Sequence, residues 1–116
     1  MGRPMNASSE KNNSFSYIQD QIDSDPIVLY MKGSKEAPMC GFSAFVCGVL
    51  KKLAVPFQDY NVMQDQQLRS DIKTFSNWPT IPQLYIKGQF IGGCDIVKEM
   101  YASGKLEALL KESGIV

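Results

Sequence analysis

Residues 27–53, with the sequence IVLYMKGSKEAPMCGFSAFVCGVLKKL, contain a strand pattern, a polar loop and a helix pattern in immediate succession. The continuous apolar run Ile27–Met31 is typical of a strand that is buried on both faces. Gly33 to Pro38 form the loop, and the pattern becomes helical from Gly41 to Leu53. A second strand is predicted from Val55 to Tyr60, so the two strands should be parallel with a right-handed crossover. The residues expected on the inner side of the helix are Phe45, Val49 and Leu53.

The flanking segments complete a small α/β fold. Before the first strand, Phe15–Ile22 suits a short amphipathic helix, which Asp25-Pro26 ends. The later elements expected are a helix from Asp65 to Phe75, a hairpin with strands at Gln83–Ile86 and Phe90–Ile91, a helix opened by Gly92-Gly93, and a last helix ending near Lys111. We therefore expect one domain over residues 15–116, with a four-stranded mixed sheet flanked by helices on both faces. Residues 1–14 are expected to be a flexible tail.

The composition limits the classes of function. The chain has 116 residues, with twelve basic and twelve acidic side chains, so its net charge gives no global field that would attract nucleic acid or an anionic membrane. Its apolar runs are too short to span a bilayer. Three cysteines, an odd number, favour a reducing compartment in which thiols serve chemistry rather than disulfide bonds. The absence of histidine excludes Cys–His and Ser–His nucleophile pairs and histidine metal ligands within this chain.

Cys40 is the candidate reactive thiol. It stands just before the helix that begins near Gly41, where the helix dipole and unpaired backbone N–H groups favour a thiolate. Lys32, at the end of the first strand, is the candidate cation, because the carboxyl end of a strand and the start of the next helix share one edge of a parallel sheet. The alternative is a buried, inert cysteine beside a solvated lysine.

The spacing of Cys40-Gly41-Phe42-Ser43 is that of a Cys-x-x-Cys redox motif with serine in the last position. A serine oxygen cannot close a disulfide, so Cys40 needs a thiol from elsewhere to resolve any mixed disulfide. Cys47 lies about two helical turns further on and is expected to fill the core.

Four motifs together resemble the monothiol glutaredoxin family of CGFS type. They are Lys32, Cys40-Gly41-Phe42-Ser43, Trp78-Pro79-Thr80-Ile81-Pro82-Gln83 and Gly92-Gly93-Cys94-Asp95. The similarity runs from about Ser14 to Ser113, and none of the motif positions departs from the family pattern. The resemblance implies a thioredoxin fold, which agrees with the element order expected above.

The resemblance also implies a pocket for glutathione. Lys32 and Arg69 would hold the glycine carboxylate, with Lys73 as either a further contact or a solvated lysine. Ile81 would offer its backbone groups to the cysteinyl part, next to a cis Ile81–Pro82 bond. The alternative for these prolines is a rigid loop before a strand. Cys94 would bind the γ-glutamyl carboxylate through its backbone N–H, and Asp95 would bind the ammonium. Asp95 is equally expected as a helix-start residue that the dipole favours.

A 2Fe–2S cluster normally needs four sulfur ligands. One chain offers Cys40 and a bound glutathione offers a second sulfur, so two chains supply four. We therefore expect a cluster that bridges a homodimer, and the family implies roles in cluster assembly and transfer to apo iron–sulfur client proteins, with a BolA-like protein as a plausible partner. The alternative is a glutathione-dependent thiol–disulfide oxidoreductase with Cys40 as nucleophile and Cys94 as a candidate resolving thiol. Whether the chain acts as an enzyme stays open between the two.

The compartment expected is the mitochondrial matrix, with the tail taken as the remainder of a processed targeting segment. A plastid and a bacterial cytoplasm are the alternatives.

Overall fold

The structure is a computed structural model that describes residues 15–116. The predicted tail, residues 1–14, lies outside the described residues. The first described element is a helix over residues 15–24, in which Ile18 and Ile22 are buried as the amphipathic pattern predicted. The elements that follow are β1 (Ile27–Met31), α2 (Gly41–Lys52), β2 (Gln58–Asn61), the short 3₁₀ helix η1 (Val62–Gln64), α3 (Gln66–Ser76), β3 (Gln83–Ile86), β4 (Gln89–Gly92), α4 (Cys94–Ser103) and α5 (Lys105–Glu112).

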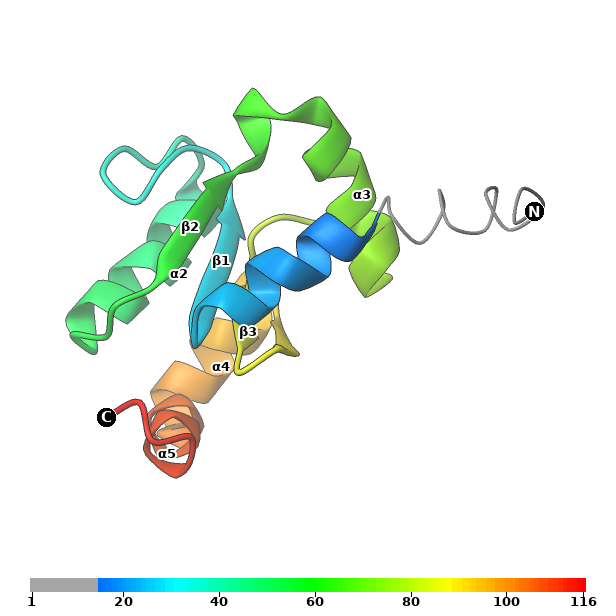
Figure 1. The fold of residues 1–116 in the computed structure, drawn as a ribbon. Coiled ribbons are helices and arrows are strands. Elements are labelled where there is room, and N and C mark those ends of the chain that lie inside the picture. Colours follow the sequence, from blue (N-terminus) through cyan, green and yellow to red (C-terminus); the bar gives the residue numbers. More distant parts are fainter. Residues whose placement is uncertain (1–14) are drawn as a thin grey trace, which may run out of the picture.

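The sheet has four strands in the order β2-β1-β3-β4 (Figure 1). β1 and β2 are parallel, as the β-α-β pattern predicted, and Tyr30 is opposite Tyr60. β3 runs antiparallel to β1, and β4 runs antiparallel to β3. The sheet is therefore mixed, in agreement with the sequence prediction.

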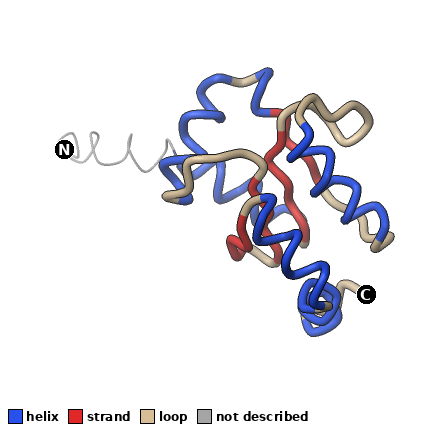
Figure 2. Tube along the Cα trace, turned by 180° about the vertical axis from the view of Figure 1, so that it is seen from behind, coloured by secondary structure: helices blue, strands red, loops and turns tan. Residues whose placement is uncertain are grey.

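Two separate groups of apolar side chains cover the two faces of the sheet. Because side chains alternate along a strand, Ile27, Leu29 and Met31 point to one face, where they pack with residues of α2, α4 and α5. Val28 and Tyr30 point to the other face, where they pack with the helix over residues 15–24 and with α3. Figures 1 and 2 view the molecule from these two sides. All five residues of β1 are fully buried, as expected for a strand covered on both faces.

Three expectations differ from the structure. Phe45, expected to point inward, is 37% exposed, because the buried side of α2 is formed by other residues: Ser43, Val46, Cys47, Val49 and Leu50. Leu53 follows the end of α2 and is only partly buried against the core. The second strand begins at Gln58 rather than at Val55, and η1 follows it directly. Val55 and Phe57 are buried, but they belong to the connection that enters the core before pairing with β1 begins.

The topology brings four chain segments to one edge of the sheet. β1 ends there at Met31, followed by Lys32, and α2 begins there after Cys40. β3 is antiparallel to β1 and pairs Gln83 with Tyr30, so the loop that precedes β3 reaches the same edge. β4 is antiparallel to β3, so its last residue, Gly92, also lies there, beside Leu84. The start of α4 follows at once, and this edge carries the candidate site.

Candidate functional site

Cys40 is the N-cap residue of α2, with extended backbone angles. Its neutral side chain makes no capping hydrogen bond. A thiolate at this position interacts favourably with the backbone N–H of Ser43, with that of Phe42 and with the charge of Lys32, and these effects together lower the pKa of Cys40 below its usual range in spite of partial burial. The predicted activation of this thiol by the helix start and by Lys32 agrees with this arrangement.

Ser43, which occupies the place of a second redox cysteine, is fully buried. Its Oγ accepts a hydrogen bond of 3.0 Å from the backbone N–H of Lys32. This bond joins the first turn of α2 to the end of β1, and so fixes the distance between the candidate cation and the candidate nucleophile. The sequence analysis considered Ser43 only as a residue that cannot form a disulfide, and its burial gave no signal in the sequence pattern.

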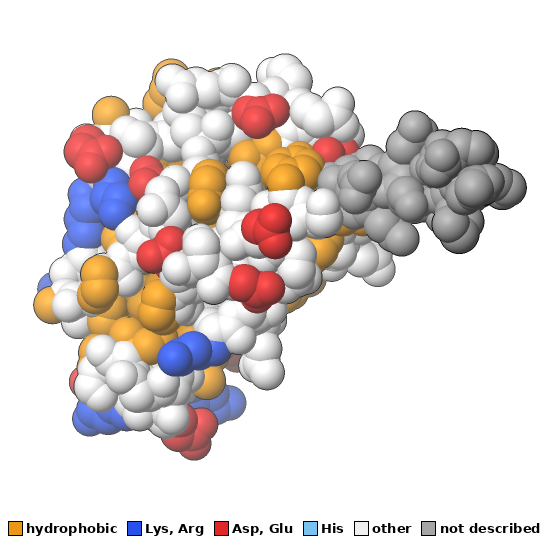
Figure 3. All heavy atoms as spheres, viewed as in Figure 1, with side chains coloured by type: hydrophobic (Ala, Val, Ile, Leu, Met, Phe, Trp, Pro, Cys, Tyr) orange, Lys and Arg blue, Asp and Glu red, His pale blue; other side chains and the backbone are white. Residues whose placement is uncertain are grey.

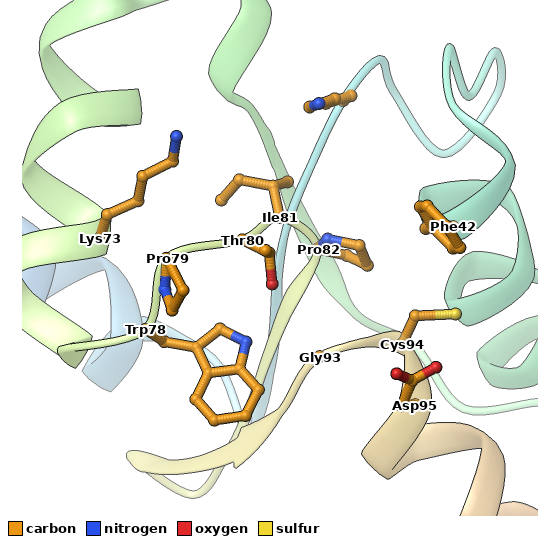
Figure 4. A pocket seen from close by; sticks show the side chains of 11 residues that line it. Phe42, Lys73, Trp78, Pro79, Thr80, Ile81, Pro82, Gly93, Cys94 and Asp95 are labelled. Atoms are coloured by element: carbon orange, nitrogen blue, oxygen red, sulfur yellow. The ribbon is translucent and has the colours of Figure 1, made fainter.

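A cleft of about 350 Å³, within the range of small-molecule sites, lies next to the start of α2, where Phe42 is part of its lining and Cys40 is not. Figure 4 shows side chains from the β1 end, α3, the loop before β3 and the start of α4 facing into it. The residues that line it are Lys32, Phe42, Lys73, Trp78, Pro79, Thr80, Ile81, Pro82, Gly93, Cys94 and Asp95.

The cleft brings together four of the residues singled out from the sequence for glutathione: Lys32, Ile81, Cys94 and Asp95. Arg69 is half-buried on α3 and is not part of the lining, whereas Lys73, one turn later, is. In Figure 4, Lys73 and Asp95 lie on opposite sides of the cleft. The lining of the cleft therefore includes one lysine from the end of β1 and one from α3, and a carboxylate and a helix N-terminus lie opposite Lys73.

The loop before β3 is stabilised by hydrogen bonds from the buried side chain of Gln83, the first residue of β3. The peptide bond between Ile81 and Pro82 is cis, as the family resemblance implied. Gln83 is fully buried, and its side-chain amide donates hydrogen bonds to the backbone oxygens of Trp78 and Thr80, at 3.1 and 3.2 Å. Gln83 is a structural residue of the site whose role the sequence analysis missed, although a polar residue at the start of a buried strand is a signal of such a role.

Trp78 packs its ring against Phe90, with 5.4 Å between the ring centroids. Its indole N–H is buried and has no hydrogen-bond partner among the described residues. In Figure 4 the indole nitrogen is directed toward the Thr80 and Gly93 side of the cleft. These contacts make Trp78 a packing residue beside the proline loop.

The three cysteines differ in environment, and all are free thiols. Cys47 is buried, as expected, and its thiol donates to the backbone oxygen of Lys35 at 3.6 Å. Burial raises the pKa of Cys47, and burial followed by the charge of Asp95 raises the pKa of Cys94. The charge of a Cys40 thiolate is a smaller influence that also raises the pKa of Cys94, which lines the cleft. Cys40 is thus the thiol best suited to ionise.

Residues 15–116 lack two further features. No cluster of three or more cysteine, aspartate or glutamate side chains able to hold a metal ion occurs in this part of the chain. None of its helices combines the length and the apolar character that a membrane span requires. On the face shown in Figure 3, acidic side chains lie singly across the middle, and acidic and basic side chains lie next to each other at the left edge and near the lower end.

Comparisons with known proteins identify the family of the chain. The family model described as glutaredoxin matches residues 27–91. A probable monothiol glutaredoxin 2 of Rickettsia typhi is 54% identical over 102 residues, which cover 88% of this chain and 92% of the relative. Monothiol glutaredoxin-5, mitochondrial, of Saccharomyces cerevisiae is 52% identical over 99 residues, which cover 83% of this chain and 66% of the relative.

Solved structures give the same result. A truncated monomeric mutant of 1-C-Grx1 from Trypanosoma brucei matches with a TM-score of 0.79 and 43% identity, over 85% of this chain and 90% of that one. A buckwheat glutaredoxin–glutathione complex matches with a TM-score of 0.79 and 26% identity, over 90% of this chain and 94% of that one. The fold is the thioredoxin fold of these proteins, and the chain belongs to the glutaredoxin family, in its monothiol class.

Proposed function

We propose that this protein binds glutathione in the cleft beside Cys40 and, with it, a 2Fe–2S cluster that bridges two copies of the chain for assembly and transfer of iron–sulfur clusters. The observation that carries the proposal is a single thiol of lowered pKa at the N-cap of α2, next to a cleft whose charges complement glutathione. The buckwheat relative, which has the same fold, was solved in complex with glutathione.

The charges of the cleft match the ends of glutathione. Glutathione has two carboxylates, one ammonium and one thiol. Lys32 and Lys73 provide positive charge for the glycine carboxylate, and we retain Arg69, on the same helix as Lys73, as a further contact of this group. The backbone N–H at Cys94 suits the other carboxylate, and Asp95 suits the ammonium. Ile81, buried in the lining, leaves its backbone groups for the cysteinyl part.

One chain supplies too few suitable thiols to bind a 2Fe–2S cluster, so ligands from outside the chain must complete its coordination. A 2Fe–2S cluster takes four sulfur ligands, and Cys40 alone combines partial exposure with a lowered pKa. Cys47 is buried in the core and its pKa is raised, and the pKa of Cys94 is raised as well. Cys40 would hold the iron in each chain, and each glutathione would add one sulfur. When bound, the cluster is the cargo that client proteins receive.

Anaerobic reconstitution with ferrous iron, sulfide and glutathione tests this proposal. We expect visible absorbance typical of a 2Fe–2S cluster in the native chain, none when glutathione is omitted, and none in Cys40→Ser. The matched control is Cys47→Ser, which should retain the absorbance because Cys47 is not a ligand. Colour that survives Cys40→Ser would contradict the proposal.

The second candidate is glutathione-dependent reduction of mixed disulfides with Cys40 as nucleophile. It is favoured by the lowered pKa of Cys40 and by the presence of Cys94 in the lining of the cleft. The burial of Ser43 and its bond to Lys32 weigh against dithiol chemistry, since no second thiol stands in the first turn of α2. A reductase assay with a glutathionylated substrate distinguishes the two: turnover in a chain that reconstitutes no cluster supports the enzyme.

The partners that follow from the cluster role are apo iron–sulfur client proteins and a BolA-like protein. The compartment we propose is the mitochondrial matrix, with a plastid or a bacterial cytoplasm as alternatives. The named relatives include a mitochondrial protein of yeast, a chloroplastic protein of Arabidopsis thaliana and proteins of Rickettsia, so each alternative has a relative. An Arg-rich segment upstream of Met1 in the gene would favour the mitochondrion.

A further inference from the structure

One side-chain oxygen joins two walls of the cleft. Asn61 ends β2, and its Oδ1 accepts hydrogen bonds from two backbone N–H groups, that of Gly33 at 3.0 Å and that of Met63 at 2.9 Å. Gly33 follows Lys32 and begins the loop that leads to Cys40, whereas Met63 lies in η1. The two donors are 30 positions apart in the sequence, so the oxygen links segments that no local turn connects.

The first of these segments sets the positions of Lys32 and Cys40. The loop that starts at Gly33 closes on itself, because the backbone N–H of Met39 donates to the backbone oxygen of Lys32 at 2.9 Å and Gly33 forms a bridge with Pro38. Met39 is the residue before Cys40. A displacement of Gly33 therefore moves the lysine and the cysteine of the site together.

The second segment leads to Lys73. η1 ends at Gln64, and α3 follows with Asp65 as its N-cap, whose side chain accepts a hydrogen bond from the N–H of Leu68. Lys73 lies in the last turn of α3 and lines the cleft from the side opposite the start of α4. If η1 left β2 in a different direction, α3 would move with it. Lys73 would then change its position in the cleft.

Gly33 has little freedom to find another partner. It is buried, its φ is +90°, and a Cβ at this position would lie 2.5 Å from the Ala37 oxygen and from the Met39 nitrogen. Its N–H donates to the Asn61 oxygen at 3.0 Å, and this acceptor satisfies it. The middle of the loop has an anchor of its own, since the backbone N–H of Lys35 donates to the Asp59 carboxylate at 2.8 Å.

We propose that Asn61 is a positioning residue, which holds the wall carrying Lys32 and the wall carrying Lys73 at the separation that glutathione requires. The glutathione part of this inference rests on the proposed function. Asn61 itself does not line the cleft, so its effect on the ligand is exerted through the two lysines.

Calorimetric titration with reduced glutathione tests the inference on three variants. Asn61→Ala removes the acceptor and should raise the Kd about fivefold, the effect of roughly one net hydrogen bond. Asn61→Asp keeps an oxygen in the same place and should remain within about twofold of the native Kd. Gln64→Ala, an exposed position in η1, is the matched control and should bind as the native chain does. If Asn61→Ala does not fold, Asn61→Ser, whose shorter side chain reaches only one N–H, takes its place.

A double-mutant cycle separates positioning from simple loss of stability. Lys32→Ala should weaken binding strongly in the native chain and clearly less in the Asn61→Ala chain, because Lys32 is no longer held in place there. Equal effects of Lys32→Ala in both chains would overturn the inference, as would an unchanged Kd in Asn61→Ala.

Amide hydrogen exchange tests the link without any ligand. The amides of Gly33 and Met63 should exchange several-fold faster in Asn61→Ala and at native rates in Asn61→Asp. Unchanged exchange at both amides would overturn the inference whatever the Kd values are. If the native chain bound no glutathione, the proposed function and the positioning role would both fail, whereas the exchange rates would still show whether Asn61 joins the two segments.

Discussion

Several groups of unequal weight, the Ser43 side chain among them, lower the pKa of Cys40. The backbone N–H of Ser43 contributes most to the lowering of its pKa, followed by that of Phe42 and then by the charge of Lys32. The thiolate is the reactive form, so the rate of alkylation rises with pH and levels off above the pKa. A lowered pKa therefore moves this plateau to lower pH than for an ordinary thiol.

Lys32→Met should move the plateau back toward higher pH, but only part of the way, because the two backbone N–H groups remain. The measurement is the pH dependence of alkylation by iodoacetamide, with mass spectrometry assigning the modification to Cys40. Lys105→Met, an exposed position on α5, serves as control and should leave the profile unchanged. A full return to the profile of a free thiol would show that the N–H groups contribute little.

Ser43 allows a test of stability at the same scale. Ser43→Ala leaves the partly buried N–H of Lys32 without its acceptor, and we expect a loss of about 1–3 kcal/mol in the free energy of unfolding. Ser103→Ala makes the same chemical change at an exposed site and should stay within about 0.5 kcal/mol of the native chain. Chemical denaturation of both variants is the measurement, and equal stability of the two would contradict the structural role of Ser43.

At the scale of elements, the loop before Cys40 depends on one glycine. Gly33→Ala places a Cβ against the backbone of Ala37 and Met39 and requires a side chain at positive φ, so we expect a loss of roughly 1–3 kcal/mol or more. The same substitution at Gly48 is the control, because it lies on the exposed side of α2 with no atom near its Cβ position. Gly48→Ala should stabilise the chain by about 0.5–1 kcal/mol, since glycine weakens a helix interior. Thermal unfolding that fails to separate the two variants would contradict this account of the loop.

Elements could be predicted where the apolar pattern and the local signals agreed. β1 has an uninterrupted apolar run between turn residues, and its bounds were predicted correctly. β2 was placed three residues early, because Val55 and Phe57 are as apolar as strand residues while the pairing with β1 begins only at Gln58. The rotation of α2 was also missed at Phe45, since the bond from Lys32 to Ser43 turns the side of Ser43 inward, and this contact has no trace in the spacing of apolar residues.

At the scale of the whole molecule, the sheet topology predicted where the site lies. It did not predict which residues line the cleft. Parallel β1 and β2 with a helix between them place Lys32 and Cys40 at one edge, which the sequence predicted. The inclusion of Lys73 rather than Arg69 in the cleft depends on how α3 leaves η1, an element that no sequence pattern announced. The family resemblance supplied the roles of Ile81, Cys94 and Asp95, which local chemistry alone left open.

The arrangement of the thiols also sets an expectation for the assembly. Each chain has one thiol suited to bind iron, and residues 15–116 contain no cluster of side chains that would hold a metal ion alone. A cluster should therefore require two chains and two glutathione molecules. Dilution or removal of glutathione should release the cluster and the two chains together, because both losses break the same set of bonds.

Native mass spectrometry of the chain after anaerobic reconstitution tests the central claim most directly. The account predicts a complex of two chains, one 2Fe–2S cluster and two glutathione molecules, which is lost in Cys40→Ser and retained in Cys47→Ser. A single chain that holds a cluster, or a cluster-bound dimer without glutathione, would contradict it.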